Sequence, residues 1–366
     1  MNNPNIVNQR MKLKFLDWLK EADGCCEATA RHIEKAIIAY EEFTKYADFK
    51  TYGPDKAKEF KKWLLNKERK GKPLAIATYY SYIKNLRKFF LWLSWQAGYK
   101  SKITPDIVNY LQVSDKDERI ATQQAIRKFP PLDYVIKLAD SIKIETEIDK
   151  RDRALIAFTF LSAMRDTAIA TLPIGCFDEE NLIVSQNPRQ GVKTKFSKFI
   201  YTPIYVFDKK LLAYTIEWVA YLKSKGFTSQ DPLFPRSKMT QGQDNLSFEE
   251  AKEVEPVFWK GAGRIREIFK NRAKEAGLQY YEPHTFRHLA FHVAYKNCKN
   301  GGEIKALSQS FGHEYVATSM AIYGNYQPQE LAEIIKGMNF TGKPKKTTDE
   351  KIDEIFNAIK KNKLDP

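Results

Sequence analysis

The residues best suited to chemistry gather near the C-terminal end of the chain. Only five histidines occur in 366 residues, and His284, His288, His292 and His313 fall within thirty residues of one another. His284 and Arg287 stand three positions apart, so a helix presents both on one face close to its N-terminus. That end of a helix favours an anion, and the two side chains can supply a proton donor and a bidentate hold on phosphate oxygens.

The same histidines allow a metal-binding alternative. His288 and His292 have the i, i+4 spacing of zinc ligands on a helix. No glutamate follows His288 as in the zinc-protease helix, and Arg287 would place a cation beside the metal. We therefore expect no metal and no cofactor, and we expect His288 and His292 to be packing residues.

Downstream, a glycine and a histidine precede a tyrosine. Gly312 and His313 end a predicted helix, and Tyr323 follows ten residues after the histidine. One tyrosine among nineteen carries no information alone. The order His-Thr-Phe-Arg, then Gly-His, then tyrosine is much more specific.

These residues need elements to position them. Apolar residues recur at helical spacing in the first hundred residues, ending in a stripe from Tyr79 to Leu93 with Gly98 as the stop. Beyond residue 130, helical segments surround two strand-like runs, 181–185 and 192–206, with residues 151–164 apolar nearly all round and so buried. The expected fold class is mainly α with a small β-sheet, an α+β protein.

The expected domain boundaries follow composition. Residues 1–112 form a helical domain, the polar segment 113–128 a linker, 129–340 a second domain and 341–366 a tail with an amphipathic segment at 352–359. Cations follow the open face of the fourth helix and its end, where they either clamp phosphates or form a solvated surface: Lys84, Arg87, Lys88, Lys100 and Lys102.

Charge and composition narrow the partners. Sixty Lys and Arg against forty-five Asp and Glu give a net charge of +15, which suits a polyanion such as nucleic acid. The longest apolar run, 154–164, is shorter than the roughly 20 residues of a membrane span. Four cysteines show neither metal-site nor disulfide spacing. We expect a cytoplasmic protein without a membrane partner.

The motifs resemble the catalytic core of the tyrosine recombinases, the phage-integrase family. "EPHTFRHLA" is similar to its His-x-x-Arg box, and "SQSFGHEYVATSMAIYGNY" to its Gly-His motif followed by the nucleophilic tyrosine. Arg165 in "TFLSAMRDTAIATLP" fits the family's first arginine. Lys195, eight residues before Pro203, fits its β-ribbon lysine, whereas Lys193 and Lys198 do not.

The resemblance covers about residues 10–335 and implies a function. Residues 1–112 would be a SAM-like core-binding domain that clamps DNA, and 129–340 the catalytic domain. Arg165 and Arg287 would hold the scissile phosphate, His284 would be the base, Lys195 the acid, and His313 would bond the phosphate. Tyr323 would form a 3′-phosphotyrosyl link without metal or ATP. The expected partners are double-stranded DNA at the nucleoid and, for recombination, a homotetramer on paired sites. The tail segment 352–359 would either dock on a neighbouring subunit or pack or fray as the C-terminus of its own subunit.

Two departures from the family pattern bear on the site. Ala168 stands where many members have an acidic residue, so another group, such as Asp166, must orient Arg165. The step from His313 to Tyr323 is one residue longer than is common, so Tyr326 is an alternative nucleophile, while Tyr315 lies too near the histidine.

Three other functions remain open at this point. The chain could be a non-catalytic DNA-binding regulator with the same fold, a topoisomerase of the related covalent type, or a metal-dependent nuclease. An enzyme for integration, excision or transposition of a mobile element is the reading that uses all six catalytic positions.

Overall fold

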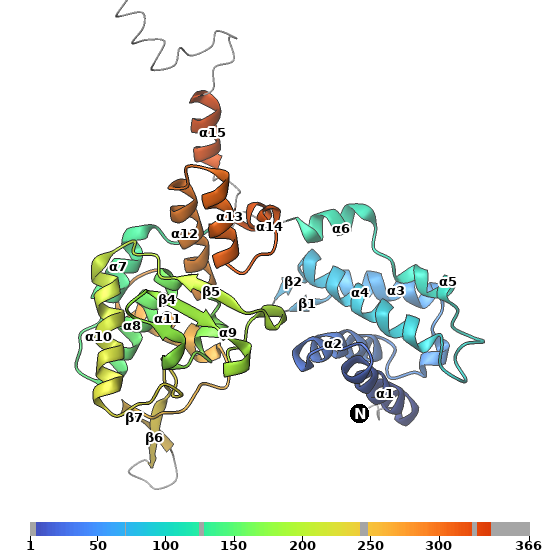
Figure 1. The fold of residues 1–366 in the computed structure, drawn as a ribbon. Helices are drawn as coiled ribbons and strands as arrows, with labels where there is room; N and C mark the ends of the chain where they lie inside the picture. Colours follow the sequence, from blue (N-terminus) through green and yellow to red (C-terminus); the bar gives the residue numbers. More distant parts are fainter. Residues whose placement is uncertain (1–4, 70, 124–127, 242–247, 324–327, 338–366) are drawn as a thin grey trace, which may run out of the picture. The chain divides into compact units, whose positions relative to one another are not determined.

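The computed structural model describes residues 5–69, 71–123, 128–241, 248–323 and 328–337. The chain divides into two compact units, residues 1–125 and 126–366 (Figure 1). The tail segment 341–366 and Tyr326 lie outside the described residues. No helix in the described part of the chain has both the length and the apolar character needed to cross a membrane.

The first unit is helical. Its longest element, α4, buries Tyr79, Ile83, Leu86 and Leu93 along one side, which confirms the predicted stripe. The unit also has a short antiparallel β-hairpin. Its elements are α1 (Ile6–Glu21), α2 (Glu27–Phe43), α3 (Pro54–Leu65), β1 (Glu68–Arg69), β2 (Lys72–Pro73), α4 (Ile76–Leu93), α5 (Pro105–Val108) and α6 (Asp115–Thr122).

The division between the units, after residue 125, falls within the segment 113–128 that the composition marks as a linker. Half of this segment forms α6, which Ser114 caps by accepting a hydrogen bond from the Asp117 amide. This helix packs against α4. It exposes most of its side chains and buries none fully, so its composition looks like that of a linker.

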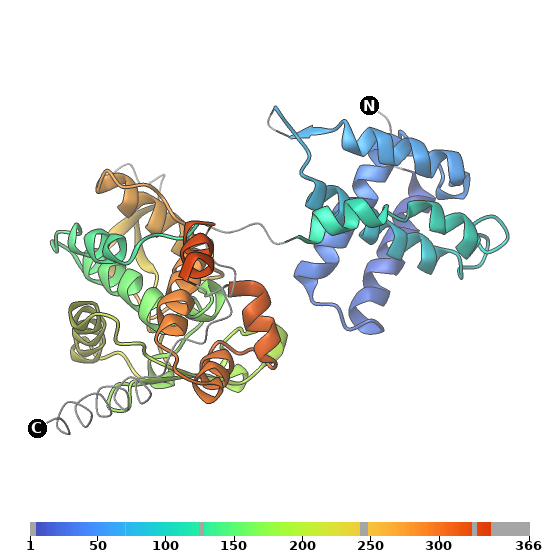
Figure 2. The ribbon, with the colours of Figure 1, turned by 90° about the horizontal axis from the view of Figure 1, so that it is seen from above.

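The second unit surrounds the buried helix α8 (Glu147–Ser162), as predicted for residues 151–164. Thr146 and Asp149 form a capping box at its start. Around α8 pack α7 (Leu132–Asp140), α10 (Lys209–Ser224) and α12 (Pro283–Lys296). The remaining helices are α9 (Asp166–Ile169), α11 (Gly263–Glu275), α13 (Gly301–Ser310), α14 (Val316–Tyr323) and α15 (Pro328–Gly337). Helices α12, α13 and α14 lie against one another (Figure 1; Figure 2).

A small antiparallel sheet runs in the order β3 (Phe177–Asp178), β4 (Ile183–Gln186) and β5 (Ile200–Pro203). The predicted second strand, 192–206, is much shorter than expected. Phe196 and Ser197 have φ values of 61° and 50°, and this left-handed backbone interrupts the extended run at residues 195–197. A separate hairpin of β6 (Ser237–Gln241) and β7 (Phe248–Val254) was not foreseen. The predicted class, mainly α with small antiparallel sheets, is confirmed.

Candidate active site

Tyr323 is the last residue of α14 and is 8% exposed. Its hydroxyl accepts a hydrogen bond of 2.8 Å from Nε of Arg287, on α12. Its ring stacks on Phe291 with centroids 4.7 Å apart, and it contacts Phe311 at 5.7 Å. Two residues that are 36 positions apart in the sequence are therefore joined directly.

Arg287 is 2% exposed and holds three parts of the second unit together. Besides the tyrosine, it donates to the carbonyl oxygen of Ala163 at 2.5 Å and to that of Phe311 at 2.6 Å. Among the described residues, no carboxylate pairs with this guanidinium. Carbonyl dipoles satisfy its N–H donors without cancelling its charge, so the site still favours an anion.

Arg165 lies at the joint between α8 and α9 and is half-buried. Burial lowers the pKa of its guanidinium, and the positive charge of Arg287 lowers it further. Two arginines that repel each other without a shared carboxylate form a site that a phosphate would stabilise. The buried Arg151 shows the contrast, since Asp152 binds it at 2.8 Å.

His313 follows α13 and is 7% exposed. Its Nδ1 lies 2.7 Å from Oγ of Ser319, which donates in turn to Oγ of Ser308 at 2.8 Å. Its Nε2 is buried and has no hydrogen-bond partner among the described residues. Burial, then the charges of Arg287 and Arg165, lower the pKa of His313 to about 4. The ring is therefore neutral at pH 7, with its buried nitrogen open to a ligand.

The other two imidazoles of the site lie along α12. His284 is half-buried near the helix N-terminus, and its ring centroid is 5.0 Å from that of His288. His288 is 5% exposed and packs edge-on against the Tyr323 ring at 4.7 Å. The sequence treated His288 as a packing residue, and it does pack. Its contact with both His284 and the tyrosine also adds it to the site.

His292 lies one turn further along α12, away from this cluster. Its ring packs against Phe129 at 5.1 Å, and Glu330 approaches its Nε2 at 3.9 Å. Within the described ranges, no group of three or more His, Cys, Asp or Glu side chains could hold a metal ion.

Lys195 is exposed on the connection between β4 and β5, with Nζ 4.9 Å from the centre of the Phe196 ring. Lys198 lies on the same connection and forms a 3.0 Å ion pair with Glu314, the residue after His313. The charges of both lysines lower the pKa of His313, so the connection lies on the side of the site where His313 is.

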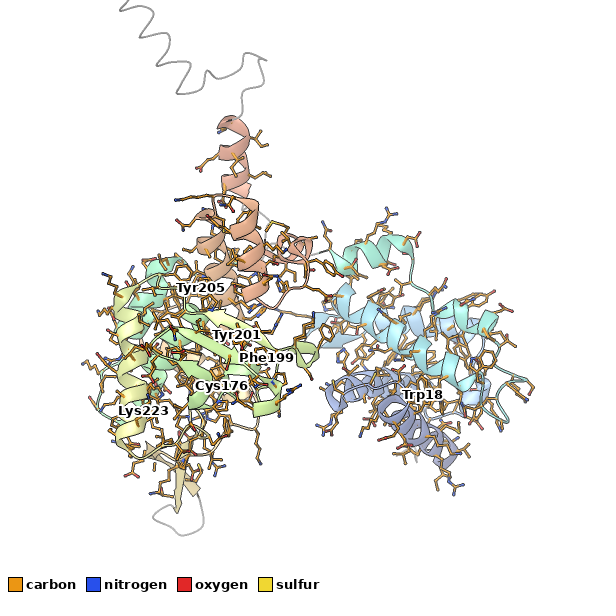
Figure 3. All side chains as sticks on the ribbon, in the orientation of Figure 1. Trp18, Cys176, Phe199, Tyr201, Tyr205 and Lys223 are labelled. Carbon is orange, nitrogen blue, oxygen red and sulfur yellow. The ribbon has the colours of Figure 1, made fainter. Side chains whose placement is uncertain are left out.

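Gly312 explains why a glycine precedes the histidine. Its φ is 70°, and a Cβ there would stand 2.4 Å from Cδ1 of Ile200 on β5. The residue before His313 must therefore lack a side chain, so that the end of α13 can lie against the sheet. Phe199 and Tyr201 flank Ile200, are 46% and 65% exposed, and lie with ring centroids 4.7 Å apart (Figure 3).

An open groove of about 540 Å³ runs beside this strand. Lys198, Tyr201, Gln309 and His313 are among the residues that line it. The groove therefore connects the β4–β5 connection with His313 of the candidate site.

Asp166 is the group that the sequence offers for orienting Arg165, and among the described residues the two side chains form no hydrogen bond or ion pair with each other. The Asp166 carboxylate instead accepts two hydrogen bonds from Arg266 on α11, at 2.9 and 2.7 Å. Ala168, at the position where many recombinases are acidic, is 1% exposed and packs in the core. No local pattern pointed to Arg266, because 100 residues separate it from Asp166.

The five cations that the sequence predicts as DNA contacts in the first unit differ in whether another side chain of the unit binds them. Lys84, Lys100 and Lys102 are exposed. Arg87 donates to Asn109 at 2.9 Å, and Lys88 forms a 2.5 Å ion pair with Asp23. Three of the five therefore present their charge to solvent.

No protein-family model matches the chain, and no curated protein matches its sequence. Solved structures do match its fold. XerH site-specific recombinase bound to a palindromic difH substrate is 17% identical, with a TM-score of 0.60 over 89% of this chain and 84% of that one. The lambda integrase dimer bound to a COC′ core site is 12% identical, with a TM-score of 0.57 over 93% and 98%. The Tn1549 transposon integrase in complex with a circular intermediate DNA is 14% identical, with a TM-score of 0.57 over 90% and 99%. The chain therefore has the fold of the tyrosine recombinases.

Proposed function

We propose that this protein is a site-specific DNA recombinase that cuts and rejoins DNA through a 3′-phosphotyrosyl intermediate at Tyr323. The observation that carries the proposal is the hydrogen bond from Arg287 to the Tyr323 hydroxyl, beside Arg165 and the open nitrogen of His313. A tyrosine serving only to pack would not require two arginines that, within the described part of the chain, lack carboxylate partners.

The arginines would stabilise the charge that develops on the phosphate. In the pentavalent transition state, negative charge grows on the two non-bridging oxygens, and fixed N–H donors are most effective there. Arg287 is held rigidly by the Ala163 and Phe311 carbonyls, so it pays little reorganisation on binding. The buried Nε2 of His313 would bond one of the same oxygens.

The reaction then balances without an outside reactant. The Tyr323 oxygen attacks phosphorus, the P–O5′ bond breaks, and the phenolic proton passes to an imidazole on α12. His284 is the candidate base, with His288 in ring contact with both it and the tyrosine. Lys195 would give a proton to the departing 5′-hydroxyl. A 5′-hydroxyl from another DNA end reverses the step, which joins new partners.

The proposal extends to partners. Double-stranded DNA is the substrate, and a homotetramer on paired sites would supply the four cleavages of recombination. The exposed Lys84, Lys100 and Lys102 would contact DNA phosphates. Integration, excision or transposition of a mobile element is the proposed biological setting.

Trapping the covalent intermediate tests the proposal. Duplex fragments from either side of the coding sequence, each with a single nick, are incubated with the protein and analysed under denaturing conditions. A protein–DNA adduct is expected, with the DNA on Tyr323 by peptide mapping, and Tyr323→Phe should abolish it. An adduct that persists in Tyr323→Phe would assign the chemistry to another residue, and no adduct on any fragment would favour a non-catalytic regulator.

A second assay separates recombination from DNA relaxation. The protein is given two marked duplexes that carry the cleaved site, alongside a supercoiled plasmid with the same site. Joined products with exchanged markers support the recombinase. Relaxed plasmid without exchanged markers would instead identify a topoisomerase of the related covalent type. Loss of activity with a chelator would indicate a metal-dependent nuclease.

A further inference from the structure

Arg165 lies in the short connection between α8 and α9, and other arginines bind this connection on both sides of it. Ala163 ends α8 with a left-handed φ of 50°, and α9 begins at Asp166. The Arg165 side chain makes no hydrogen bond or ion pair with another described residue. Its direction must therefore come from the backbone that holds it.

Arg287 holds the first side of this joint through the Ala163 carbonyl. Arg266 holds the second side through the Asp166 carboxylate, which is 13% exposed. The other Asp166 oxygen accepts a hydrogen bond from the Thr167 amide at 2.8 Å, which fixes the start of α9. The two contacts lie on either side of Arg165, at Ala163 two residues before it and at Asp166 one residue after it.

These two arginines lie on helices that pack against each other. Arg266 lies on α11 and Arg287 on α12, and the rings of Phe269 and Phe286 join these helices edge to face at 5.0 Å. Ile265 and Phe269, on either side of Arg266 along α11, are buried in the core. The Asp166 carboxylate is thus tied to the same scaffold that positions Arg287 and, through it, Tyr323.

We infer that Arg266 and Asp166 are a positioning pair that fixes Arg165 relative to Arg287. This inference rests on the proposed function. The pair takes the place of a direct acidic contact to Arg165, which Ala168 does not provide. Arg266 itself is 56% exposed, and exposed ion pairs contribute little to global stability. Its effect should appear in the rate of the chemical step.

The test compares Asp166→Asn, Arg266→Gln, Arg266→Lys and the double variant Asp166→Asn/Arg266→Gln. Arg264→Gln is the matched control, because Arg264 lies on the same helix but pairs with Glu250 and Glu267. Three quantities are measured. Two use the duplex that forms the adduct: the single-turnover rate of adduct formation at saturating protein and the dissociation constant at fixed salt. The third is the melting temperature of each protein variant.

Each single neutral variant should lower the rate about ten- to a hundred-fold, the size expected when a catalytic group is displaced by about 1 Å. The double variant should lose no more than either single, since both remove the same interaction. The rate of Arg266→Lys should fall between that of Arg266→Gln and that of the unsubstituted protein. The rate of Arg264→Gln should match the unsubstituted protein. The dissociation constant and melting temperature should change little.

Other outcomes overturn the inference. Unchanged rates would show that Arg165 does not need the pair. Weaker DNA binding in Arg266→Gln without a defect in Asp166→Asn would make Arg266 a direct phosphate contact. An equal loss in Arg264→Gln would reflect charge alone. If the unsubstituted protein forms no adduct, the proposed function is contradicted, and this inference, which rests on it, is contradicted as well.

Discussion

Nε of Arg287 donates to the Tyr323 hydroxyl across 2.8 Å, while the other two nitrogens of the guanidinium hold the Ala163 and Phe311 carbonyls. One buried side chain thus fixes the candidate nucleophile, the end of α8 and the end of α13. Structure and chemistry depend on the same group, so substitutions here must separate the two.

Arg287→Lys keeps the charge but loses the fixed fork of donors. We expect adduct formation to fall by at least about a hundred-fold, since one ammonium cannot serve the tyrosine, two carbonyls and a phosphate. Urea unfolding should show a loss of stability, because carbonyls buried in the native protein lose their donors. The exposed Arg189→Lys is the control and should leave both quantities unchanged. A lysine variant with full activity would contradict the role of the fork.

Gly312→Ala should destabilise the second unit by about 1–3 kcal/mol beyond the left-handed strain of that position, because the new Cβ meets Ile200 in a packed site. Gly277→Ala separates the two causes, since Gly277 has a φ of 66° but open space around it. That variant should cost only the left-handed strain of about 1–2 kcal/mol. Adding Ile200→Val, which removes Cδ1, should recover part of the loss at Gly312 and nothing at Gly277. Chemical denaturation measures all four variants.

His313 makes stability depend on pH in a defined direction. Its pKa is about 4 in the folded protein, below the value near 6.5 of an unfolded histidine. The unfolded chain binds more protons between these values, so the contribution of His313 is fully present above about pH 6.5 and is lost as pH falls toward 4. Urea unfolding across this range should show the loss, and His313→Gln should flatten that part of the curve. NMR titration of the free protein should find an imidazole that stays neutral at pH 6; a normal titration would contradict the burial argument.

Binding of a phosphate should raise the lowered pKa of His313 again. Ser319 donates to Ser308, so Nδ1 of neutral His313 carries the proton and Nε2 holds a lone pair. Nε2 must gain a proton before it can donate to a phosphate oxygen. We therefore expect DNA binding near pH 6 to take up protons, measured as a dependence of the binding heat on buffer ionisation enthalpy. His313→Gln should reduce this uptake.

The identity of the acid can be tested through the leaving group. Lys195→Ala should slow cleavage of ordinary DNA but not of DNA with a 5′-bridging sulfur, because a thiolate departs without a proton. Lys198→Ala is the paired control, since Lys198 lies on the same connection and binds Glu314. If the sulfur-containing DNA restored the cleavage rate of Lys198→Ala but not that of Lys195→Ala, the general acid would be Lys198 and not Lys195.

Part of the fold and of the candidate site follows from local sequence. The stripe on α4, the buried α8 and the pairing of His284 with Arg287 on α12 need only helical periodicity, since residues three or four apart share a face. The glycine before His313 likewise marks a position where a side chain does not fit. Such patterns repeat within one element and so are visible along the chain.

Contacts between distant segments were decided by tertiary structure alone. Nothing local joins Arg266 to Asp166, places His288 against Tyr323, or links His313 through Ser319 to Ser308. Helix α6 and the turn at residues 195–197 were not predicted for a related reason, because surface helices and turns carry weak patterns of burial. Residue types at short spacing determine which chemistry is possible. Packing of separate helices determines which side chains share a charge, a proton or a buried pocket, since those distances exist only once the core has formed.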